Sequence, residues 1–375
     1  MNSPINDNPL LLRIATSVVR GMGIDIAQKL FEILPDEKAF FEMPEQELKG
    51  ILGGKSKIYQ HDYRMSCIEK AEKELKFVTD NNINVTYYTD DNFPARMLNA
   101  PDAPILLYTI GKADLNSKHI ISIVGTRRAT EYGKRFTTNL VLELAKSIPD
   151  LVVVSGLAYG IDIAAHRAAL KAGISTVAVQ ACGLNKIYPS EHRNDAIKII
   201  RNNGMIVSDY TSQDEMHRGN FIARNRIIAA LADCTVVVES AQKGGALITA
   251  NIAQSYNREV MALPGRVTDE LSSGCNRLIQ NNQAAVITCA DDLLNLMGWE
   301  MKAGKTHTLL ELFPELTDDE QTIIDIIKQQ GDTHINVITS KANLPVYRVM
   351  SALVELDCKG LVMTLPGCRY AIAKR

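Results

Sequence analysis

The central part of the chain alternates short, continuous apolar runs with longer segments in which apolar residues recur every three or four positions. Continuous runs of β-branched residues predict strands buried on both faces, and the intervening pattern predicts amphipathic helices. Strands that alternate with helices form βαβ units and a parallel sheet covered on both sides. The pattern therefore predicts an α/β fold, a doubly wound, Rossmann-like parallel sheet, over residues 91–298. Its expected strands are HIISIVG at 119–125, LVVVSG at 151–156, STVAVQA at 175–181, GMIVSDY at 204–210, CTVVVES at 234–240, REVMALPG at 258–265 and AAVITC at 284–289.

Other patterns precede and follow this domain. Residues 1–90 show helical periodicity and predict a small helical N-terminal domain. The Gly-Met-Gly sequence at 21–23 fits a helix-hairpin-helix, a SAM-like domain or an ordinary tight turn between helices, and one such turn does not decide among them. Residues 91–111 contain several prolines and predict a connection, and residues 299–314 predict a polar linker that holds the only tryptophan.

Residues 315–375 predict a winged-helix-like C-terminal domain. Thr317 and Glu320 form a capping box at a helix start, and two further helical segments precede two strand runs joined by a Pro-Gly turn. The helix expected to read DNA in such a domain offers few cations, mainly Arg348 and Lys359, among acidic neighbours. A protein-binding or vestigial role is therefore as well supported as DNA reading.

The overall composition indicates a globular protein and gives no sign of a general nucleic-acid binder. Of the 375 residues 46% are hydrophobic, and 41 Lys and Arg stand against 43 Asp and Glu, so any anion site must be local. Seven scattered cysteines without a C-x-x-C pair favour reduced thiols and no structural metal. We find no signal-peptide pattern and no apolar run near the ~18 residues of a membrane span, and we expect a cytoplasmic protein with no membrane association.

Basic residues and glycines of the central domain gather where the predicted strands end. Because carboxyl ends of parallel strands meet at one edge of a sheet, these loops should converge. Glycine backbone, guanidinium groups and hydroxyls are groups that bind phosphate oxygens, so the loops predict a phosphate-recognising groove. Its candidate residues are Gly125, Arg127, Arg128, Lys134, Arg135, Ser155, Gly156, His217, Arg218, Arg224, Arg226, Lys243, Gly244, Gly245, Thr249 and Arg266.

Each of these features also has a structural explanation. An arginine-rich turn is usually solvated surface, and we expect these arginines on exposed loops. Asp162 and His166, one helical turn apart, fit a paired structural histidine as well as a functional pair. Phe221 fits a core position or a π face for an unstacked base, and Asn225 fits a cap. The gathering of such loops at one sheet edge favours a common ligand.

Seven segments of the chain carry a resemblance to a known family: IVGTRRATEYG, VVSGLAYGIDIAAHRAAL, VSDY, FIARNRIIAAL, VVVESAQKGGALITANIA, VMALPG and GCNRLIQ. In order and spacing they resemble the DNA-processing protein A (DprA/Smf) family across roughly residues 95–298. The resemblance implies a Rossmann-like core between a helical N-terminal domain and a winged-helix-like C-terminal domain. It also implies a protein with no known catalytic chemistry, metal or cofactor. Such a protein binds single-stranded DNA without sequence preference, forms a homodimer and helps load the RecA recombinase on incoming DNA in natural transformation.

The resemblance also assigns individual positions. Arg218 stands three places before Phe221, where the family often has Lys, and keeps the charge. Ile222 replaces a frequent proline, and the family's Ser-Gly before LIT is Gly-Gly-Ala here. The resemblance suggests residues 274–288 as the dimer-forming edge. It places DNA binding at Gly125, Thr126, Arg127, Ser155, Gly156, Arg224 and Asn225.

Other functions fit the fold less well. A nucleotide-binding or nucleotide-hydrolysing protein would use a Gly-Gly loop such as GGALITAN, but an acid–base carboxylate is missing at the corresponding place. A dinucleotide-dependent oxidoreductase needs G-x-G-x-x-G, and here Thr126, Arg127 and Arg128 follow Gly125. A scaffold with a relic pocket is a further alternative. We therefore expect no catalytic residue and no NAD-type cofactor.

Overall fold

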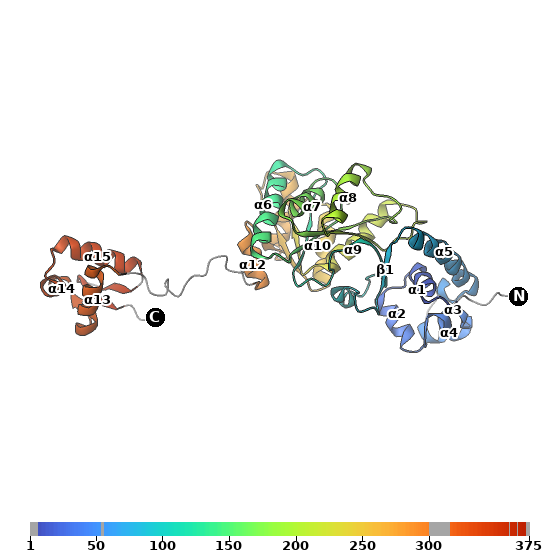
Figure 1. The fold of residues 1–375 in the computed structure, drawn as a ribbon, viewed down its shortest axis with the longest axis horizontal. Coiled ribbons are helices and arrows are strands. Elements are labelled where there is room, and N and C mark those ends of the chain that lie inside the picture. The colour runs from blue at the N-terminus through green and yellow to red at the C-terminus, as the bar shows by residue number, and fades with distance from the viewer. Residues whose placement is uncertain (1–6, 54–55, 300–315, 360, 366, 373–375) are drawn as a thin grey trace. The chain divides into compact units, whose positions relative to one another are not determined.

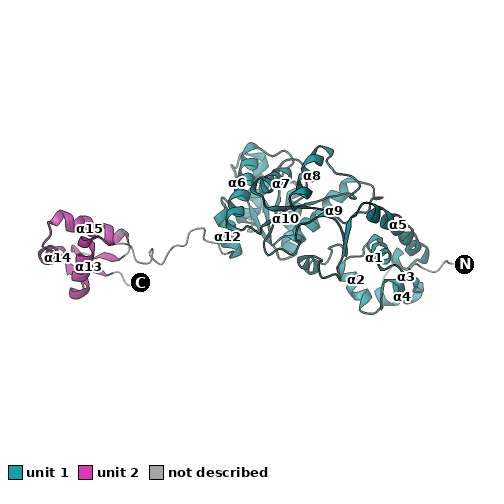
Figure 2. Cartoon of the chain, in the orientation of Figure 1, with its two compact units in different colours: residues 1–302 teal, residues 303–375 magenta. Residues whose placement is uncertain are grey.

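The chain folds into two compact units, residues 1–302 and residues 303–375 (Figure 2). Unit 1 combines a helical N-terminal region with a large sheet domain, and the boundary predicted after residue 90 lies inside it (Figure 1). The computed structural model describes residues 7–53, 56–299, 316–359, 361–365 and 367–372.

The N-terminal region is helical, as predicted, and its Gly-Met-Gly turn packs against the sheet domain. A Cβ atom on Gly23 would lie 3.2 Å from the carbonyl oxygen of Pro101, and the Ile24 N–H donates to the carbonyl of Ala103 at 3.3 Å. Because this turn contacts the protein's own backbone, the packing favours an ordinary tight turn between helices. The helices are α1 (Pro9–Val18), α2 (Ile24–Phe31), α3 (Glu37–Glu42), α4 (Glu45–Leu52), η1 (Lys57–Tyr59) and α5 (His61–Asp80).

The sheet has nine strands in the order β1-β2-β6-β5-β4-β3-β7-β8-β9. Strands β3 to β9 are parallel and match the seven predicted strands, which confirms the doubly wound fold. The strands are β1 (Asn84–Tyr87), β2 (Leu106–Gly111), β3 (Ile120–Val124), β4 (Val152–Ser155), β5 (Ser175–Val179), β6 (Met205–Ser208), β7 (Cys234–Val237), β8 (Glu259–Ala262) and β9 (Ala285–Val286).

One edge of the sheet corrects the sequence prediction. Residues 91–111 were predicted to be a connection, but the end of that segment forms β2, which pairs antiparallel with β6 and with β1. The prolines that suggested a connection, at positions 94, 101 and 104, all precede β2 and lie just before or after the 3-10 helix η2 (Ala95–Asn99). Proline is excluded from a paired strand but not from the turn before it, so the composition of the whole segment hid the strand.

Helices cover both faces of the parallel strands (Figure 1). One face carries α6 (Glu131–Ser147), α7 (Ile161–Ala172), α8 (Arg193–Arg201) and α12 (Ala290–Met297). The opposite face carries α9 (Arg218–Leu231), α10 (Gly245–Ser255) and α11 (Ser273–Gln280), and its apolar core continues into the N-terminal helices. The helix N-termini therefore lie at the strand ends where the candidate loops were predicted to meet.

The start of the predicted linker belongs to unit 1. Trp299 packs its ring against His119, with ring centroids 4.8 Å apart. The rest of that linker, residues 300–314, lies outside the described residues.

Unit 2 has the predicted winged-helix form. Its three helices are followed by a hairpin, and the capping box of Thr317 and Glu320 is present. Val349, Leu353 and Leu356 are buried as their spacing predicts, but Val346 is exposed. The elements are α13 (Asp318–Gln330), β10 (Thr333–His334), α14 (Ile335–Ala342), α15 (Val346–Cys358), β11 (Val362–Leu365) and β12 (Arg369–Ile372), with the sheet order β10-β12-β11.

The described residues form neither a candidate membrane span nor a candidate metal site. None of their helices combines the length and the apolar character that a membrane span requires. In the same part of the chain, no three His, Cys, Asp or Glu side chains gather as metal ligands. The thiols of Cys67, Cys182, Cys234, Cys275, Cys289 and Cys368 are free.

Candidate nucleic-acid interface

A pocket of about 670 Å³ opens at the carboxyl ends of the central strands. The loops after β3, β4, β5 and β7 and the first turns of α9 and α10 contribute to its lining. It leaves out nine of the candidates, namely Arg128, Lys134, Arg135, Ser155, Gly156, His217, Arg226, Lys243 and Arg266. It brings together the candidates Gly125, Thr126, Arg127, Arg218, Phe221, Arg224, Asn225, Gly244, Gly245 and Thr249.

The rim of this pocket combines aromatic rings with exposed cations. The guanidinium carbon of Arg127 lies 5.1 Å from the ring centroid of Phe221, and the Tyr188 ring lies 5.3 Å from that of Phe221. Arg127 and Arg218 are exposed, and Phe221 is half-buried in the pocket wall. Guanidinium groups bind phosphates and aromatic faces accept bases, so the rim presents both groups that an unpaired nucleotide chain requires.

The floor of the pocket contains a buried arginine, contrary to the expectation of an exposed loop. Arg224 lies on α9 with 4% of its surface exposed. Its Nη1 donates to the carbonyl oxygen of Gly156 at 2.8 Å and to that of Val179. These carbonyls stand at the ends of β4 and β5, so Arg224 joins two strand ends. The ARN segment was predicted as a loop, but it forms a helix that turns this side chain inward.

A buried carboxyl group accompanies Arg224 beneath the pocket. Asp162, at the start of α7, accepts a hydrogen bond from the Ala158 N–H at 3.4 Å. Burial raises the pKa of Asp162, and the positive charge of Arg224 opposes this shift. Burial likewise lowers the pKa of Arg224, and Asp162 opposes that shift. Because each group favours the charged form of the other, the floor is a mutually dependent polar cluster.

Three of the predicted contacts with DNA are positions that packing determines. The Ser155 hydroxyl is fully buried and donates to the carbonyl of Ile123 at 2.6 Å. A Cβ atom on Gly156 would lie 2.6 Å from the Arg224 guanidinium, and one on Gly125 would lie 2.5 Å from Ile161 of α7. Ser155 and Gly156 thus shape the floor from below, and the Gly125 turn allows a helix to approach the strand.

Another wall of the pocket is the open start of α10. Gly244 is the residue before this helix and makes no side-chain cap. A Cβ atom on Gly245 would meet no other atom within 4 Å, so the backbone there borders open space. Helix N-termini carry partial positive charge and backbone N–H donors. This wall therefore complements the cationic rim as a place for phosphate oxygens.

The structure decides between the two explanations of His166. Its Nδ1 lies 2.8 Å from the Thr176 hydroxyl, and the ring is fully buried away from the pocket lining. Burial lowers the pKa of His166 to about 3, so the folded protein keeps this ring neutral at neutral pH. His166 is a structural histidine whose hydrogen-bond partner is Thr176, whereas Asp162 belongs to the polar cluster in the floor of the pocket.

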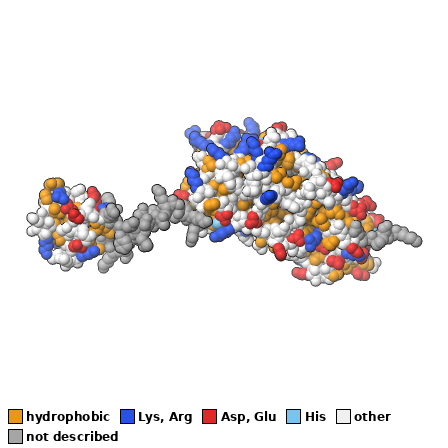
Figure 3. Space-filling model, viewed as in Figure 1, with side chains coloured by type: hydrophobic (Ala, Val, Ile, Leu, Met, Phe, Trp, Pro, Cys, Tyr) orange, Lys and Arg blue, Asp and Glu red, His pale blue; other side chains and the backbone are white. Residues whose placement is uncertain are grey.

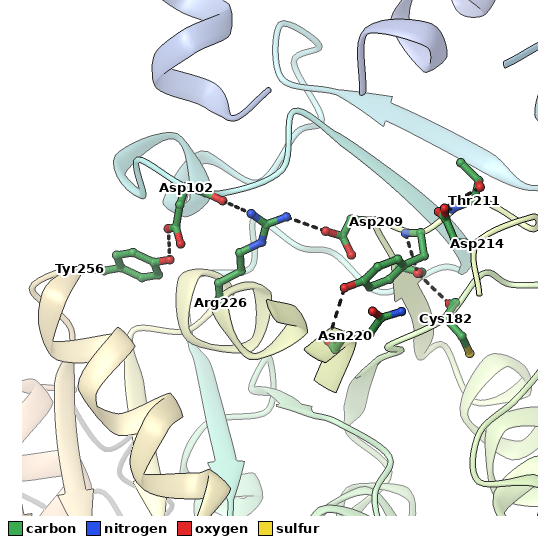
Figure 4. A network of polar contacts seen from close by, with 10 residues as sticks. Asp102, Cys182, Asp209, Thr211, Asp214, Asn220, Arg226 and Tyr256 are labelled. Atoms are coloured by element: carbon green, nitrogen blue, oxygen red, sulfur yellow. Dashed lines mark hydrogen bonds and ion pairs between the residues drawn. The ribbon is translucent and has the colours of Figure 1, made fainter. Parts of the chain in front are cut away.

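A polar network holds α9 on the side away from the pocket (Figure 4). Arg226 Nη2 donates to the Asp209 carboxylate at 2.8 Å, and Nη1 donates to the backbone carbonyl of Asp102 at 2.5 Å. The Asp102 carboxylate accepts a hydrogen bond from the Tyr256 hydroxyl, at the end of α10. One loop thus fixes both helices that form a wall of the pocket, and Arg226 belongs to this network.

Further predicted cations also lie elsewhere. Lys134 pairs with Glu131 at 2.8 Å. Arg266 lines a separate pocket, together with Glu239 and Glu270. His217 is the residue before α9 and does not line the candidate pocket. The carboxyl ends of the parallel strands do meet at a pocket, as the sequence predicted. The sequence alone could not decide which cations of each loop line that pocket.

Sequence reasoning missed Tyr188, which lines the pocket beside Phe221. This residue follows β5 in the segment KIYPSEH, at a strand end that contributed no candidate. The signal was available, because β5 ends at the same edge as its neighbours and an aromatic residue follows it closely.

Comparison with known proteins agrees with this geometry. Residues 84–298 match the family model of DNA recombination-mediator protein A, and residues 311–368 match the DprA winged helix domain. The Smf protein of Synechocystis is 31% identical over 401 residues, covering 95% of this chain and 97% of that protein.

Two solved structures are also similar. The X-ray structure of DNA processing protein A from Streptococcus pneumoniae has a TM-score of 0.64 and 30% identity, covering 76% of this chain and 97% of that one. The Helicobacter pylori protein, whose structure was described for its single-stranded DNA binding mode, has a TM-score of 0.51 and 32% identity, covering 58% and 97%. With the first family model spanning more than half of its length, the chain belongs to the DNA recombination-mediator protein A (DprA/Smf) family.

Proposed function

We propose that this protein binds single-stranded DNA through the candidate pocket without sequence preference. The observation that carries the proposal is the Arg127 guanidinium over the Phe221 ring, with Tyr188 beside it, at an open mouth. Aromatic faces accept every base, and guanidinium groups neutralise phosphates regardless of sequence. The single-stranded DNA binding described for the Helicobacter pylori relative supports the same ligand here.

We also propose that the protein is a recombination mediator that helps load a RecA-type recombinase on incoming DNA in natural transformation. It would act in the cytoplasm, without catalytic chemistry of its own and with no membrane association. Membership of a family described as recombination mediators supports this role. Assembly of recombinase on DNA already covered by a single-strand binding protein, measured with and without this chain, tests it.

The proposed active form is a homodimer that pairs through residues 274–288. This segment includes β9, an edge strand of the nine-stranded sheet, and Val286 on it is 44% exposed. An exposed sheet edge offers unpaired backbone groups to a second chain. Sedimentation equilibrium should give twice the chain mass, and Val286→Asp should shift the population toward the monomer.

Fluorescence anisotropy with labelled oligonucleotides tests the DNA-binding proposal. Oligothymidylate and a mixed-sequence single strand should bind alike, a duplex of the same length should bind more weakly, and added salt should weaken binding steeply. Tight, sequence-selective duplex binding would overturn the proposal.

Calorimetry with NAD, NADP and FAD tests the alternative of a dinucleotide site. We expect no heat of binding, because the Arg127 side chain lies over Phe221 where a pyrophosphate would approach the turn after β3. Dinucleotide binding that an oligonucleotide displaces would instead indicate a nucleotide-sensing protein.

A further inference from the structure

Positive charge is concentrated on one face of unit 1. Residues 120–204 carry eleven Lys and Arg and six Asp and Glu, although the whole chain has a net charge of -2. Figure 3 shows Lys and Arg side chains gathered over α6, α7 and α8. We call the exposed residues Lys171, Arg193, Lys198 and Arg201, at the end of α7 and along α8, the α8 track.

The cations of the α8 track have few counter-charges among the described residues: Lys198 helps to lower the pKa of Asp195, but Arg167 is the cation in contact with that carboxylate. On the same helices, Arg167 pairs with Asp195 at 2.9 Å. Within the described part of the chain, no salt bridge involves a residue of the α8 track. Four like charges that form no salt bridge with the protein repel one another, so an external polyanion would relieve this cost in free energy.

The α8 track begins next to the pocket. Tyr188 lines the pocket, and α8 starts at Arg193, five residues further along the chain. From Arg193 to Arg201 the helix rises about 12 Å, at about 1.5 Å per residue. The cations therefore extend away from the mouth of the pocket along the surface of one helix.

We propose that single-stranded DNA leaving the pocket past Tyr188 continues along the α8 track, which contacts its phosphates. The inference rests on the proposed function and extends the site beyond the pocket. The only large apolar side chain that α8 exposes is Ile197, among its described residues, whereas protein interfaces need an apolar core. Phosphate contacts alone carry no sequence information, in keeping with a ligand of any sequence.

The test compares two triple variants of the full chain that lose equal charge. One is Lys171→Gln, Lys198→Gln and Arg201→Gln in the α8 track. The matched control is Lys70→Gln, Lys73→Gln and Lys76→Gln on α5, where all three lysines are exposed. Each is titrated with oligothymidylates of about 6 and about 25 nucleotides, the shorter matching the lower range of single-strand site sizes.

We expect the track variant to bind the short oligonucleotide within about twofold of the unchanged protein and the long one about tenfold more weakly at low salt. The slope of log affinity against log salt for the long strand should fall by about 2, since each phosphate contact contributes about 0.7. The control should change neither value.

The remaining outcomes separate the inference from the proposed function. If the unchanged protein binds neither oligonucleotide, the proposed function fails. If it binds both and the track variant binds the long strand equally well, the proposed function stands and the α8 track is overturned. The inference is also overturned if the track variant loses affinity equally for the short and the long strand, or if the track and control variants lose affinity equally. A loss of affinity seen only with a duplex of the same length overturns it as well. Finally, the inference is overturned if the track variant loses affinity for poly-glutamate but keeps its affinity for DNA.

Discussion

The rim and the floor of the pocket use arginine in opposite ways. Arg127 and Arg218 at the rim are exposed, and the Arg127 guanidinium lies over an aromatic ring. Arg224 in the floor is buried, donates to two backbone carbonyls and lies near a buried carboxyl group. The rim therefore has charge to offer a ligand, whereas the charge of the floor is already engaged by the protein.

This difference separates two roles that one sequence motif had joined. The FIARN segment contributes Phe221 to the rim and Arg224 to the floor, from successive turns of α9. Changes at the floor should act on folding first and on DNA binding as a consequence. Changes at the rim should act on DNA binding alone.

The largest effect is expected from Arg224→Ala. It leaves the Asp162 carboxyl without its positive neighbour and removes a donor from two strand-end carbonyls. Breaking a buried charged cluster by removing one partner costs about 3–5 kcal/mol, and we expect a loss of that size in the free energy of unfolding of unit 1. Urea denaturation followed by circular dichroism measures it.

A second substitution serves as the control for this prediction. Adding Asp162→Asn to Arg224→Ala removes the buried acid that the first change leaves unbalanced, so the double variant should recover part of the lost stability. An Arg224→Ala protein that unfolds like the unchanged protein would show that the floor does not depend on this side chain.

The next effect is a pH dependence that originates beneath the floor. His166 stays neutral in the folded protein down to a pKa of about 3, whereas the unfolded chain binds a proton near the ordinary value of 6.5. The contribution of His166 to the free energy of unfolding is therefore fully present above the pKa of the unfolded chain. It is lost by about 1.4 kcal/mol per pH unit as the pH falls below that pKa. Between about pH 7.5 and about pH 5.5 the loss should reach about 1.4 kcal/mol.

The variant His166→Gln isolates this contribution, because glutamine does not titrate. The difference in unfolding free energy between the unchanged protein and the variant should shrink as pH falls across that range. Parallel pH profiles for the two proteins would contradict the assignment of a neutral buried ring.

A smaller free-energy effect, confined to binding, is expected at the rim. Arg127→Ala and Arg218→Ala should each weaken oligothymidylate binding about tenfold, because each removes an exposed cation that lines the pocket. The free energy of unfolding should change by less than about 0.5 kcal/mol, as is usual for exposed residues. Arg128→Ala is the matched control, since Arg128 is exposed but does not line the pocket.

Equal losses for Arg127→Ala and Arg128→Ala would show that net charge near this loop matters and the pocket does not. Loss of stability in Arg127→Ala would place that side chain with the floor instead. Either result would remove the distinction between rim and floor.

Much of this arrangement could be predicted because parallel strands have a strong local signal. Runs such as VVV at 152–154 are buried on both faces and identify strands without tertiary knowledge, and their common direction fixes the edge where ligands bind. The direction of a side chain is a different matter. Arg218 and Arg224 occur on one helix six residues apart, and only the packing of that helix decides which is exposed.

Burial also explains why two residues that were predicted to contact DNA have structural roles. Ser155 and Gly156 stand at the end of β4, at the ligand edge that the sequence predicted. The Ser155 hydroxyl donates to a buried backbone carbonyl, however, and Gly156 leaves room for the Arg224 side chain. Neither fact depends on local sequence, because both partners come from other elements. The DNA-binding role of all these residues stays a prediction for the experiments above.

The smallest effect is expected from the winged-helix unit, in contrast with the rim. Deleting residues 315–375 should weaken oligothymidylate binding by no more than about twofold, less than either rim substitution. On α15 and after it, Arg348 pairs with Asp319 at 2.5 Å and Lys359 pairs with Glu320 at 2.6 Å, so both cations are neutralised within the unit. The exposed side chains of α15 include Tyr347, Met350 and Val354, which offer no charge to a phosphate. Anisotropy titration of the shortened chain measures the effect, and a loss beyond about tenfold would make this unit the main DNA contact.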